Sequence, residues 1–391
     1  MILPLDGLTN LGLHNYTVFA NLLTLPMQPS LGVVASFNIV YIINVALSGF
    51  AMFILARRLT GRTAESWIAG LVFAWSPFLV ARGSSHFSLA AAAPIPLFVY
   101  WFDRACTTTR MRDGACAGAM LAWAAFSDPY YAIYCVLLGI IIVISRLFVL
   151  SHEQASAGRR QARVVVDVLI ATLACLMIGV YGVAGGAVRI GALTVTMRTL
   201  YTPMLVMTTL AAIRILLTAR FSVAWVPVPL RSIRTIAAMG VSTAILLAPE
   251  LYAIAVLAAE GRFSRAPVLW RSSAPGVDLL SFFLPNPNHP LAPHAIVAWL
   301  GQQPGNFDEN VVSISWIGVA IIIAAWRWAA FRPSRLWLAI TLGFASLTLG
   351  PFILVAGHRT FIPTPWTLLR FLPLVGDARM PPRFGVVVIM G

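Results

Sequence analysis

Long apolar stretches, separated by short polar segments, follow one another along almost the whole chain. Apolar runs occupy residues 32–56, 64–82, 86–103, 114–127, 129–150, 164–185, 198–217, 233–258, 311–328 and 336–357, and a further run begins at Phe384. The hydrocarbon core of a bilayer takes about 20 residues of helix. Runs of this length predict membrane-spanning helices, and the shorter runs predict partial or tilted spans.

Composition agrees with this pattern. Of the 391 residues, 59% are hydrophobic and only 10% are charged, whereas about a quarter of the residues are charged in soluble domains. We therefore predict an all-α fold, a polytopic bundle of transmembrane helices with about ten spans and the start of another.

Most of the basic residues, all of them arginine, fall in every second loop between the runs. The arginine-rich loops hold residues 57–62, 104–112, 146–163, 214–234 and 327–335. Because loops rich in basic residues face the cytoplasm in membrane proteins, one topology satisfies all of them, with the alternate loops outside. The net charge of +14 then reflects membrane topology rather than nucleic-acid binding.

This topology divides a single transmembrane domain, residues 1–391, into membrane and outer segments. The segments are an outer loop remnant (1–31), membrane helices (32–258), a large outer loop (259–310), membrane helices (311–357), an outer loop (358–383) and the start of a truncated span (384–391). The first segment lies outside with no span before it, and the chain ends inside an apolar run. Both features indicate a chain that is cut at both ends.

Most of the titratable side chains outside the arginine-rich loops fall on the outer segments. Five of the six histidines and eight of the thirteen acidic residues lie there or at the outer ends of spans. Catalysis and ligand binding use such groups, so we expect the functional site at the outer boundary of the membrane.

Asp128 and Pro129 interrupt the apolar sequence in WAAFSDPYYAIYC. An ionisable group at membrane depth marks a functional site, and we expect water or a cavity at the outer surface to solvate this carboxylate. The same carboxylate can cap the helix that Pro129 begins, and the two roles are compatible. Tyr130, Tyr131 and Tyr134 suit an aromatic belt at the interface, and they would also suit stacking against a sugar or packing a lipid chain.

Several stretches in this order resemble a known superfamily. They are LPLDGLTNLGLHNYTVFANLLTLPM (3–27), LSGFAMFILARRLTG, AGLVFAWSPFLVARGSSHFSLAAAAPIPLFV, LLSFFLPNPNHPL (279–291), ENVVSISWIGVAIII and LPLVGDARMPPRFGVVV (372–388). Together they are similar to bacterial polytopic membrane proteins of the GT-C glycosyltransferase superfamily, including YfhO-like membrane proteins. The resemblance covers most of the chain, and residues 165–230 are the least similar part.

The resemblance implies a helix bundle in the bacterial cytoplasmic membrane with an active site at its outer ends. Such proteins move a sugar from a polyprenyl-phosphate donor to a glycan, lipid or protein acceptor of the cell envelope. The resemblance also implies a catalytic acid in the first outer loop, where this chain has Asp6. We expect Asp6 to be the general base, with Asp128 as the second candidate, although Asp-Gly is also an ordinary turn pair.

The leaving phosphate of such a donor needs positive charge. Arg379 and Arg383 flank two prolines just before the last apolar run, and Arg82 lies at another outer turn, close to His86. The three arginines are therefore the candidates for binding the donor phosphate. The alternative is that they bind ordinary lipid phosphates or a nearby acid such as Asp377.

The remaining candidates would recognise the substrate. They are His14, His86, Tyr130, Asp278, His289, Asp308 and Glu309. A divalent metal ion could be held by His14, His289 and the acidic pair at 308–309, although their spacing matches no local metal motif. No other cofactor is expected, because the glycines form no nucleotide-binding motif.

Two other classes of function remain open. A transporter or lipid flippase would use charges and broken helices near the bilayer midplane, often in two matching halves, and the chain shows no convincing internal repeat. A non-catalytic membrane protein of the same fold would lack the catalytic acid. Mid-span charge pairs favour transport, whereas an acid-bearing first outer loop favours the enzyme.

Overall fold

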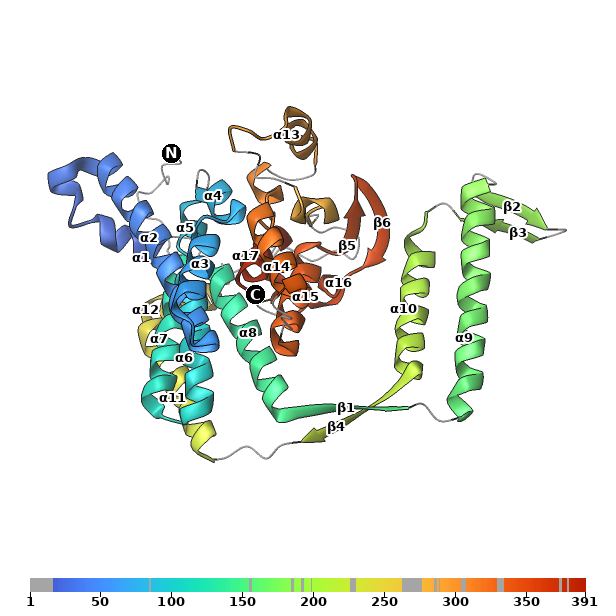
Figure 1. Cartoon of the computed structure of the whole chain (residues 1–391), viewed down its shortest axis with the longest axis horizontal. Helices are drawn as coiled ribbons and strands as arrows, with labels where there is room; N and C mark the ends of the chain where they lie inside the picture. The colour runs from blue at the N-terminus through green and yellow to red at the C-terminus, as the bar shows by residue number, and fades with distance from the viewer. Residues whose placement is uncertain are drawn as a thin grey trace.

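Figure 1 shows the computed structural model of the chain. It describes residues 17–391 except 84–85, 155–156, 184–185, 191–192, 198, 226–229, 262–275, 285–286, 288, 304–306, 329–333, 373–374 and 378–379. The described residues are mostly helical and include three small two-stranded sheets. The prediction of a helical bundle is therefore confirmed in its main feature.

The α-helices are α1 (Val18–Thr24), α2 (Gln28–Thr60), α3 (Thr63–Ala74), α4 (Pro77–Gly83), α5 (Phe87–Ala90), α6 (Pro94–Thr108), α7 (Met111–Ser127), α8 (Pro129–Leu147), α9 (Ala157–Leu176), α10 (Tyr201–Thr218), α11 (Leu230–Leu246), α12 (Ala248–Ala259), α13 (His294–Gly301), α14 (Trp316–Trp328), α15 (Arg335–Thr348), α16 (Trp366–Leu369) and α17 (Gly385–Met390). Other helical turns are η2 (Met177–Val183), η3 (Leu279–Phe282), η4 (Phe307–Asn310), η5 (Val375–Asp377) and η6 (Pro381–Phe384). The antiparallel strand pairs are β1 (Phe148–Gln154) with β4 (Ala219–Trp225), β2 (Ala187–Ile190) with β3 (Leu193–Thr196), and β5 (Phe352–Val355) with β6 (His358–Pro363).

Apart from α9 and α10, the described helices form the main body of the molecule (Figure 1). In this body the first half of the chain packs against the C-terminal part around α8. The ring of Tyr134 on α8 lies 4.6 Å from that of Phe384, and Phe344 on α15 lies 5.9 Å from Phe384. All three side chains are buried in one core cluster, together with Phe78 of α4 and Leu89 of α5. Burying an aromatic or leucine side chain stabilises a fold by about 1.5–3 kcal/mol, so this cluster fixes α4, α5 and α8 against the C-terminal helices.

Helices α9 and α10 form a separate hairpin, seen at the right of Figure 1. The ribbon β1–β4 connects this hairpin to the main body, and Tyr201 at the start of α10 contacts the rings of Phe352 and Phe361 at 5.2 and 6.2 Å. Apolar side chains such as Val165 and Ile215 are more than half exposed on these helices. Such surfaces are typical of helices that face lipid.

Within the part of the chain that the structure describes, five helices are long and apolar enough to cross a membrane. They are Gln28–Thr60, Thr63–Gly83, Pro129–Leu147, Arg159–Gly182 and Tyr201–Thr218. The pair Arg231–Leu246 and Ala248–Ala259, bent by 71°, would make a sixth. Helices α6, α7, α14 and α15 have 15, 17, 13 and 14 residues. The chain is thus a membrane-type helical protein, and the count of about ten spans stays a prediction.

Two of the predicted runs are interrupted. In the run at 336–357, α15 ends at Thr348, because Gly350 takes a left-handed φ of 69° and Pro351 follows it. Strand β5 therefore replaces the last part of a predicted membrane helix. In the run at 86–103, Pro94 and Pro96 cannot donate the hydrogen bonds that would continue a helix from Phe87, so α5 and α6 are separate.

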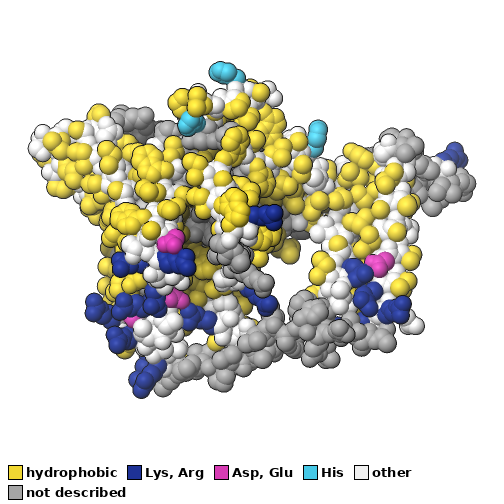
Figure 2. All heavy atoms as spheres, in the orientation of Figure 1, with side chains coloured by type: hydrophobic (Ala, Val, Ile, Leu, Met, Phe, Trp, Pro, Cys, Tyr) yellow, Lys and Arg dark blue, Asp and Glu magenta, His cyan; other side chains and the backbone are white. Residues whose placement is uncertain are grey.

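Several arginine-rich loops come together at one end of the main body. Arg58 Nε and Arg146 Nη2 lie 3.5 and 2.7 Å from the carboxylate of Asp103, and Arg104 Nε lies 3.2 Å from Asp113. Figure 2 shows most arginines along the lower part of the molecule and the visible histidines along its upper edge. The predicted separation of arginines from histidines is therefore present on this face.

Candidate functional site

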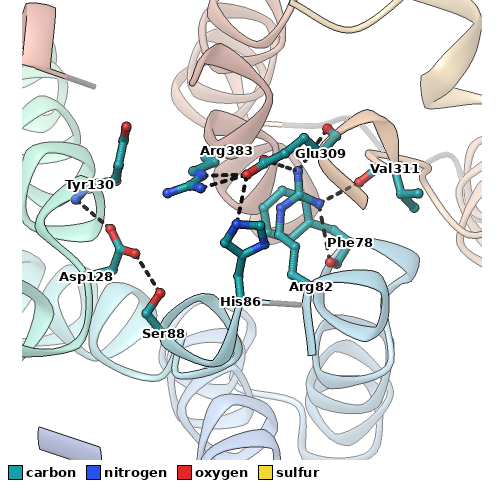
Figure 3. Close-up of polar contacts among 9 residues, drawn as sticks. All are labelled: Phe78, Arg82, His86, Ser88, Asp128, Tyr130, Glu309, Val311 and Arg383. Atoms are coloured by element: carbon teal, nitrogen blue, oxygen red, sulfur yellow. Dashed lines mark hydrogen bonds and ion pairs between the residues drawn. The ribbon is translucent and has the colours of Figure 1, made fainter. Parts of the chain in front are cut away.

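Four charged or titratable side chains meet where α4, η4 and η6 approach one another. They are Arg82, His86, Glu309 and Arg383, here called the charge cluster (Figure 3). Arg383 donates to Glu309 Oε1 from Nε at 2.9 Å and from Nη2 at 2.7 Å. Arg82 Nη2 lies 3.4 Å from Glu309 Oε2, and His86 Nε2 lies 3.6 Å from Oε1. Three segments that are distant in sequence thus share one carboxylate.

Arg82 is the most deeply placed member of the charge cluster, because its side chain is completely buried. It donates to the backbone carbonyl oxygens of Val311 at 2.7 Å and of Glu309 at 3.1 Å. Its guanidinium lies 3.6 Å from the ring centroid of Phe78. A buried charge is tolerated only when it is paired and hydrogen-bonded, and Arg82 meets both conditions through its two terminal nitrogens, whereas Nε has no hydrogen-bond partner among the described residues.

Local sequence explains why the two arginines stand where they do. Helix α4 begins at Pro77 and carries Arg82 in its last turn, where a cation suits the negative end of the helix. Pro381 and Pro382 start the turn η6, and their fixed φ leads directly to Arg383. Both side chains therefore project from short helices that begin with proline.

Electrostatics keep Glu309 ionised. Burial raises the pKa of the Glu309 carboxyl. The charge of Arg82, the hydrogen bond and charge of Arg383, and the nearby His86 lower this pKa, and together they outweigh the effect of burial. The net result is a pKa below the ordinary glutamate value. Glu309 therefore carries its negative charge throughout the neutral range.

This pKa predicts how stability depends on pH. A carboxyl whose folded pKa is depressed contributes stability above its unfolded pKa, about 4.3 for glutamate, and loses it as pH falls through the lower folded value. We expect the difference in thermal unfolding midpoint between wild type and Glu309→Gln to be constant from about pH 8 to pH 5 and to shrink below about pH 4. Melting curves in detergent at several pH values measure it. A difference that grows on acidification would contradict the ionised state of Glu309.

Asp128 lies beside the charge cluster. Its Oδ1 accepts a hydrogen bond from Tyr130 N at 2.9 Å, and its Oδ2 accepts one from Ser88 Oγ at 2.9 Å. The predicted capping role is confirmed. The expected exposure to water at the outer surface is wrong, because Asp128 is completely buried and Ser88 of α5 donates to its carboxylate. The guanidinium of Arg383 lies 4.8 Å from the ring centroid of Tyr130, so the capped helix start borders the charge cluster.

The predicted aromatic belt fails for two of its three members. Tyr131 and Tyr134 are completely buried. Tyr131 Oη donates to the backbone oxygen of Leu89, and Tyr134 packs against Phe384. The C-terminal helices cover this side of α8, so only the partly exposed Tyr130 stays near the surface.

Asp278 lies outside the charge cluster and has a structural role. It caps η3 by accepting from Leu280 N at 2.9 Å, and it accepts from Gly357 N at 2.7 Å. These two backbone bonds tie the large outer loop to the turn between β5 and β6. The structure therefore provides no support for Asp278 as a substrate-binding residue.

The other predicted residues divide between the surface and the undescribed parts of the chain. His289 is exposed, and its Nδ1 accepts a hydrogen bond from Leu291 N at 3.1 Å. Asp308 is half-buried on η4, next to Glu309. Asp6, His14 and Arg379 lie outside the described residues. Among the residues that the structure covers, no group of three or more His, Cys, Asp or Glu could hold a metal ion.

Three contributors were not anticipated from sequence: Ser88, Phe78 and the backbone of Val311. Ser88 had one available signal, because it follows His86 by two residues on the same outer turn. A ring four residues before Arg82 is also a normal helical neighbour. The Val311 carbonyl had no sequence signal, since its role depends on a contact across 229 positions.

Comparison with known proteins gives a family match. A family model described as a domain of unknown function (DUF6311) matches residues 19–221, more than half of the chain. No curated protein and no solved structure matches the chain. The matched part includes Arg82, His86, Asp128 and Tyr130, whereas Glu309 and Arg383 follow it. By the extent of this match, the chain belongs to the DUF6311 family, a domain of unknown function.

Proposed function

We propose that this chain is a glycosyltransferase of the GT-C type in the bacterial cytoplasmic membrane. It would move a sugar from a polyprenyl-phosphate donor to an acceptor of the cell envelope on the outer face. The observation that carries the proposal is the meeting of two arginines, a histidine and two carboxylates at the end of an apolar helix bundle. The arginines and the histidine suit phosphate binding, and glycosyl transfer needs a carboxylate.

The two partly exposed members of the charge cluster would bind the donor phosphate. The side chains of His86 and Arg383 are 27% and 12% exposed, whereas Arg82 and Glu309 are buried. Arginine presents a planar fork that matches phosphate oxygens. In this arrangement Glu309 and Arg82 fix the position of Arg383, and Arg383 and His86 face the phosphate.

Asp128 would act as the general base. It would take the proton of the acceptor hydroxyl while that oxygen attacks the anomeric carbon, and the bond between sugar and phosphate would break with its electron pair leaving on the phosphate. The hydroxyl of Ser88 already donates to Asp128 Oδ2, which is the bond an acceptor hydroxyl would make in its place. Asp6, the acid implied by the resemblance, is the other candidate for this role.

Transfer by the reconstituted full chain tests the proposal. Proteoliposomes would receive labelled polyprenyl-phosphate sugars and a lipid acceptor, and the labelled product would be measured. We expect Asp128→Asn to abolish transfer while leaving the protein inserted, and Arg383→Gln to raise the donor concentration needed. Asp103→Asn, at the arginine-rich end, is the matched control and should retain transfer. Full activity of Asp128→Asn would remove this residue from the mechanism.

One observation favours a second candidate, a non-catalytic membrane protein of the same fold. Glu309 already binds both arginines, so the charge cluster is also suited to holding segments together. Wild-type protein that transfers none of the sugars offered would support that candidate. Movement of the donor across the bilayer without transfer would instead indicate a flippase.

A further inference from the structure

Helices α7 and α11 run parallel, with their backbones in direct contact. A Cβ added to Gly114 would collide with the backbone oxygen of Thr235, and one added to Gly118 would collide with that of Met239. Both partners advance by four residues, so the helices point the same way. Thr243 Oγ1 also donates to the backbone oxygen of Gly118 at 3.1 Å. The two helices therefore begin at the same end of the bundle.

Four arginines surround these two helix starts: Arg110, Arg112, Arg231 and Arg234. Each lies within four residues of Gly114 or Thr235, which is about 6 Å along a helix. All four side chains are exposed, and none takes part in an ion pair in the described part of the chain. Figure 2 shows arginines gathered at the lower left, where Figure 1 places the ends of α7 and α11.

The one acid on these two helix starts is already occupied. Asp113 is buried, contacts Arg104 Nε at 3.2 Å and accepts a hydrogen bond from Thr108 Oγ1 at 2.6 Å. It therefore leaves the four surrounding arginines as an excess of positive charge. An anion would be needed to neutralise them.

Exposed apolar side chains adjoin the arginines. Met111 is 59% exposed and Ile233 is 52% exposed, and further along α11 Val241 and Ile245 are more than half exposed. Positive charge at the helix starts and an apolar surface running away from them match the two parts of a phospholipid. A soluble anion would use the arginines but not the apolar surface.

We propose that Arg110, Arg112, Arg231 and Arg234 form a binding site for the headgroup of an anionic phospholipid. Its acyl chains lie along the exposed face of α11. This site is separate from the charge cluster, and it does not depend on the proposed enzymatic function.

Lipid retention tests this site. The full chain would be placed in nanodiscs containing equal amounts of phosphatidylglycerol and phosphatidylcholine, extracted into mild detergent, and analysed for bound lipid by native mass spectrometry. Each arginine near an anionic surface contributes about fivefold to binding, so Arg112→Gln with Arg234→Gln should lower phosphatidylglycerol retention about 25-fold. The control pair, Arg57→Gln with Arg160→Gln, removes the same charge from α2 and α9 and should lower retention by clearly less than the Arg112/Arg234 pair, because neither residue lies at the starts of α7 and α11.

Three further results decide the matter. Arg112→Lys with Arg234→Lys should keep most of the retention, and this variant also covers the case in which the glutamine pair fails to fold. Equal losses of phosphatidylglycerol retention in the Arg112/Arg234 pair and in the control pair would overturn the proposal, because only the overall charge would then matter. Tight binding of inorganic pyrophosphate with no lipid retained would overturn it as well, because the ligand would then be a soluble anion.

Discussion

Replacing Glu309 with glutamine is expected to cost about 3–5 kcal/mol of the free energy of unfolding. The substitution keeps the shape of the side chain but removes the carboxylate that forms ion pairs with both Arg82 and Arg383. Arg82 is completely buried, so it would be left as an uncompensated charge. Unfolding of the purified protein in detergent, followed by circular dichroism, measures the loss.

Asp308 supplies the matched control for this prediction. It is an acid on the same short helix, but it is only half-buried, and Asp308→Asn should change stability by less than about 0.5 kcal/mol. Adding Arg82→Met to Glu309→Gln should recover part of the loss, because the completely buried Arg82 charge is then removed together with its partner, and only the partly exposed Arg383 loses its carboxylate. Equal effects of Glu309→Gln and Asp308→Asn would show that the charge cluster contributes little.

The charge cluster also explains how the site and the fold depend on each other. Arg82 connects α4 to residues 309 and 311, and Arg383 connects η6 to the same carboxylate. Loss of Glu309 would therefore loosen the start of the C-terminal helix and displace Arg383 from the ring of Tyr130. A variant of Glu309 that loses activity must be examined for stability before a chemical role is assigned to it.

Much of this arrangement could be predicted from the sequence, because it follows from apolar run lengths and arginine positions. Those patterns placed Arg82, His86, Glu309 and Arg383 at the same ends of their segments. They could not show which of these side chains touch, since Arg82 and Glu309 are 227 positions apart. Asp278 and Glu309 look alike in sequence, yet Asp278 caps a local turn and Glu309 meets two arginines.

Other differences have local causes that an apolar pattern does not reveal. The run at 129–150 continues into β1, because its last residues pair with β4, about 70 positions later. The burial of Asp128 depends on α5, a helix of four residues. Tertiary contacts made by such short segments decide whether a carboxylate meets water or a hydroxyl.

Substituting alanine at two glycines of neighbouring helices is expected to give very different effects on stability, and Gly118→Ala should be strongly destabilising. Its Cβ would collide with the backbone oxygen of Met239 and would come within 3.0 Å of the Cβ of Ser242. Backbone cannot move aside as a flexible side chain can, so α7 and α11 must separate, at a cost of about 3 kcal/mol. Gly240 lies on α11 in open space, and Gly240→Ala should be neutral or stabilise by up to about 1 kcal/mol through helix propensity.

The two alanine variants also connect the helix contact to the lipid site. The contact at Gly114 and Gly118 brings the starts of α7 and α11 together, and with them Arg112 and Arg234. Gly118→Ala should therefore lower both the unfolding midpoint and the retention of phosphatidylglycerol, whereas Gly240→Ala should lower neither. Normal stability in Gly118→Ala would contradict the close packing of these helices. Normal lipid retention despite reduced stability would show that the arginines hold the headgroup without the help of this contact.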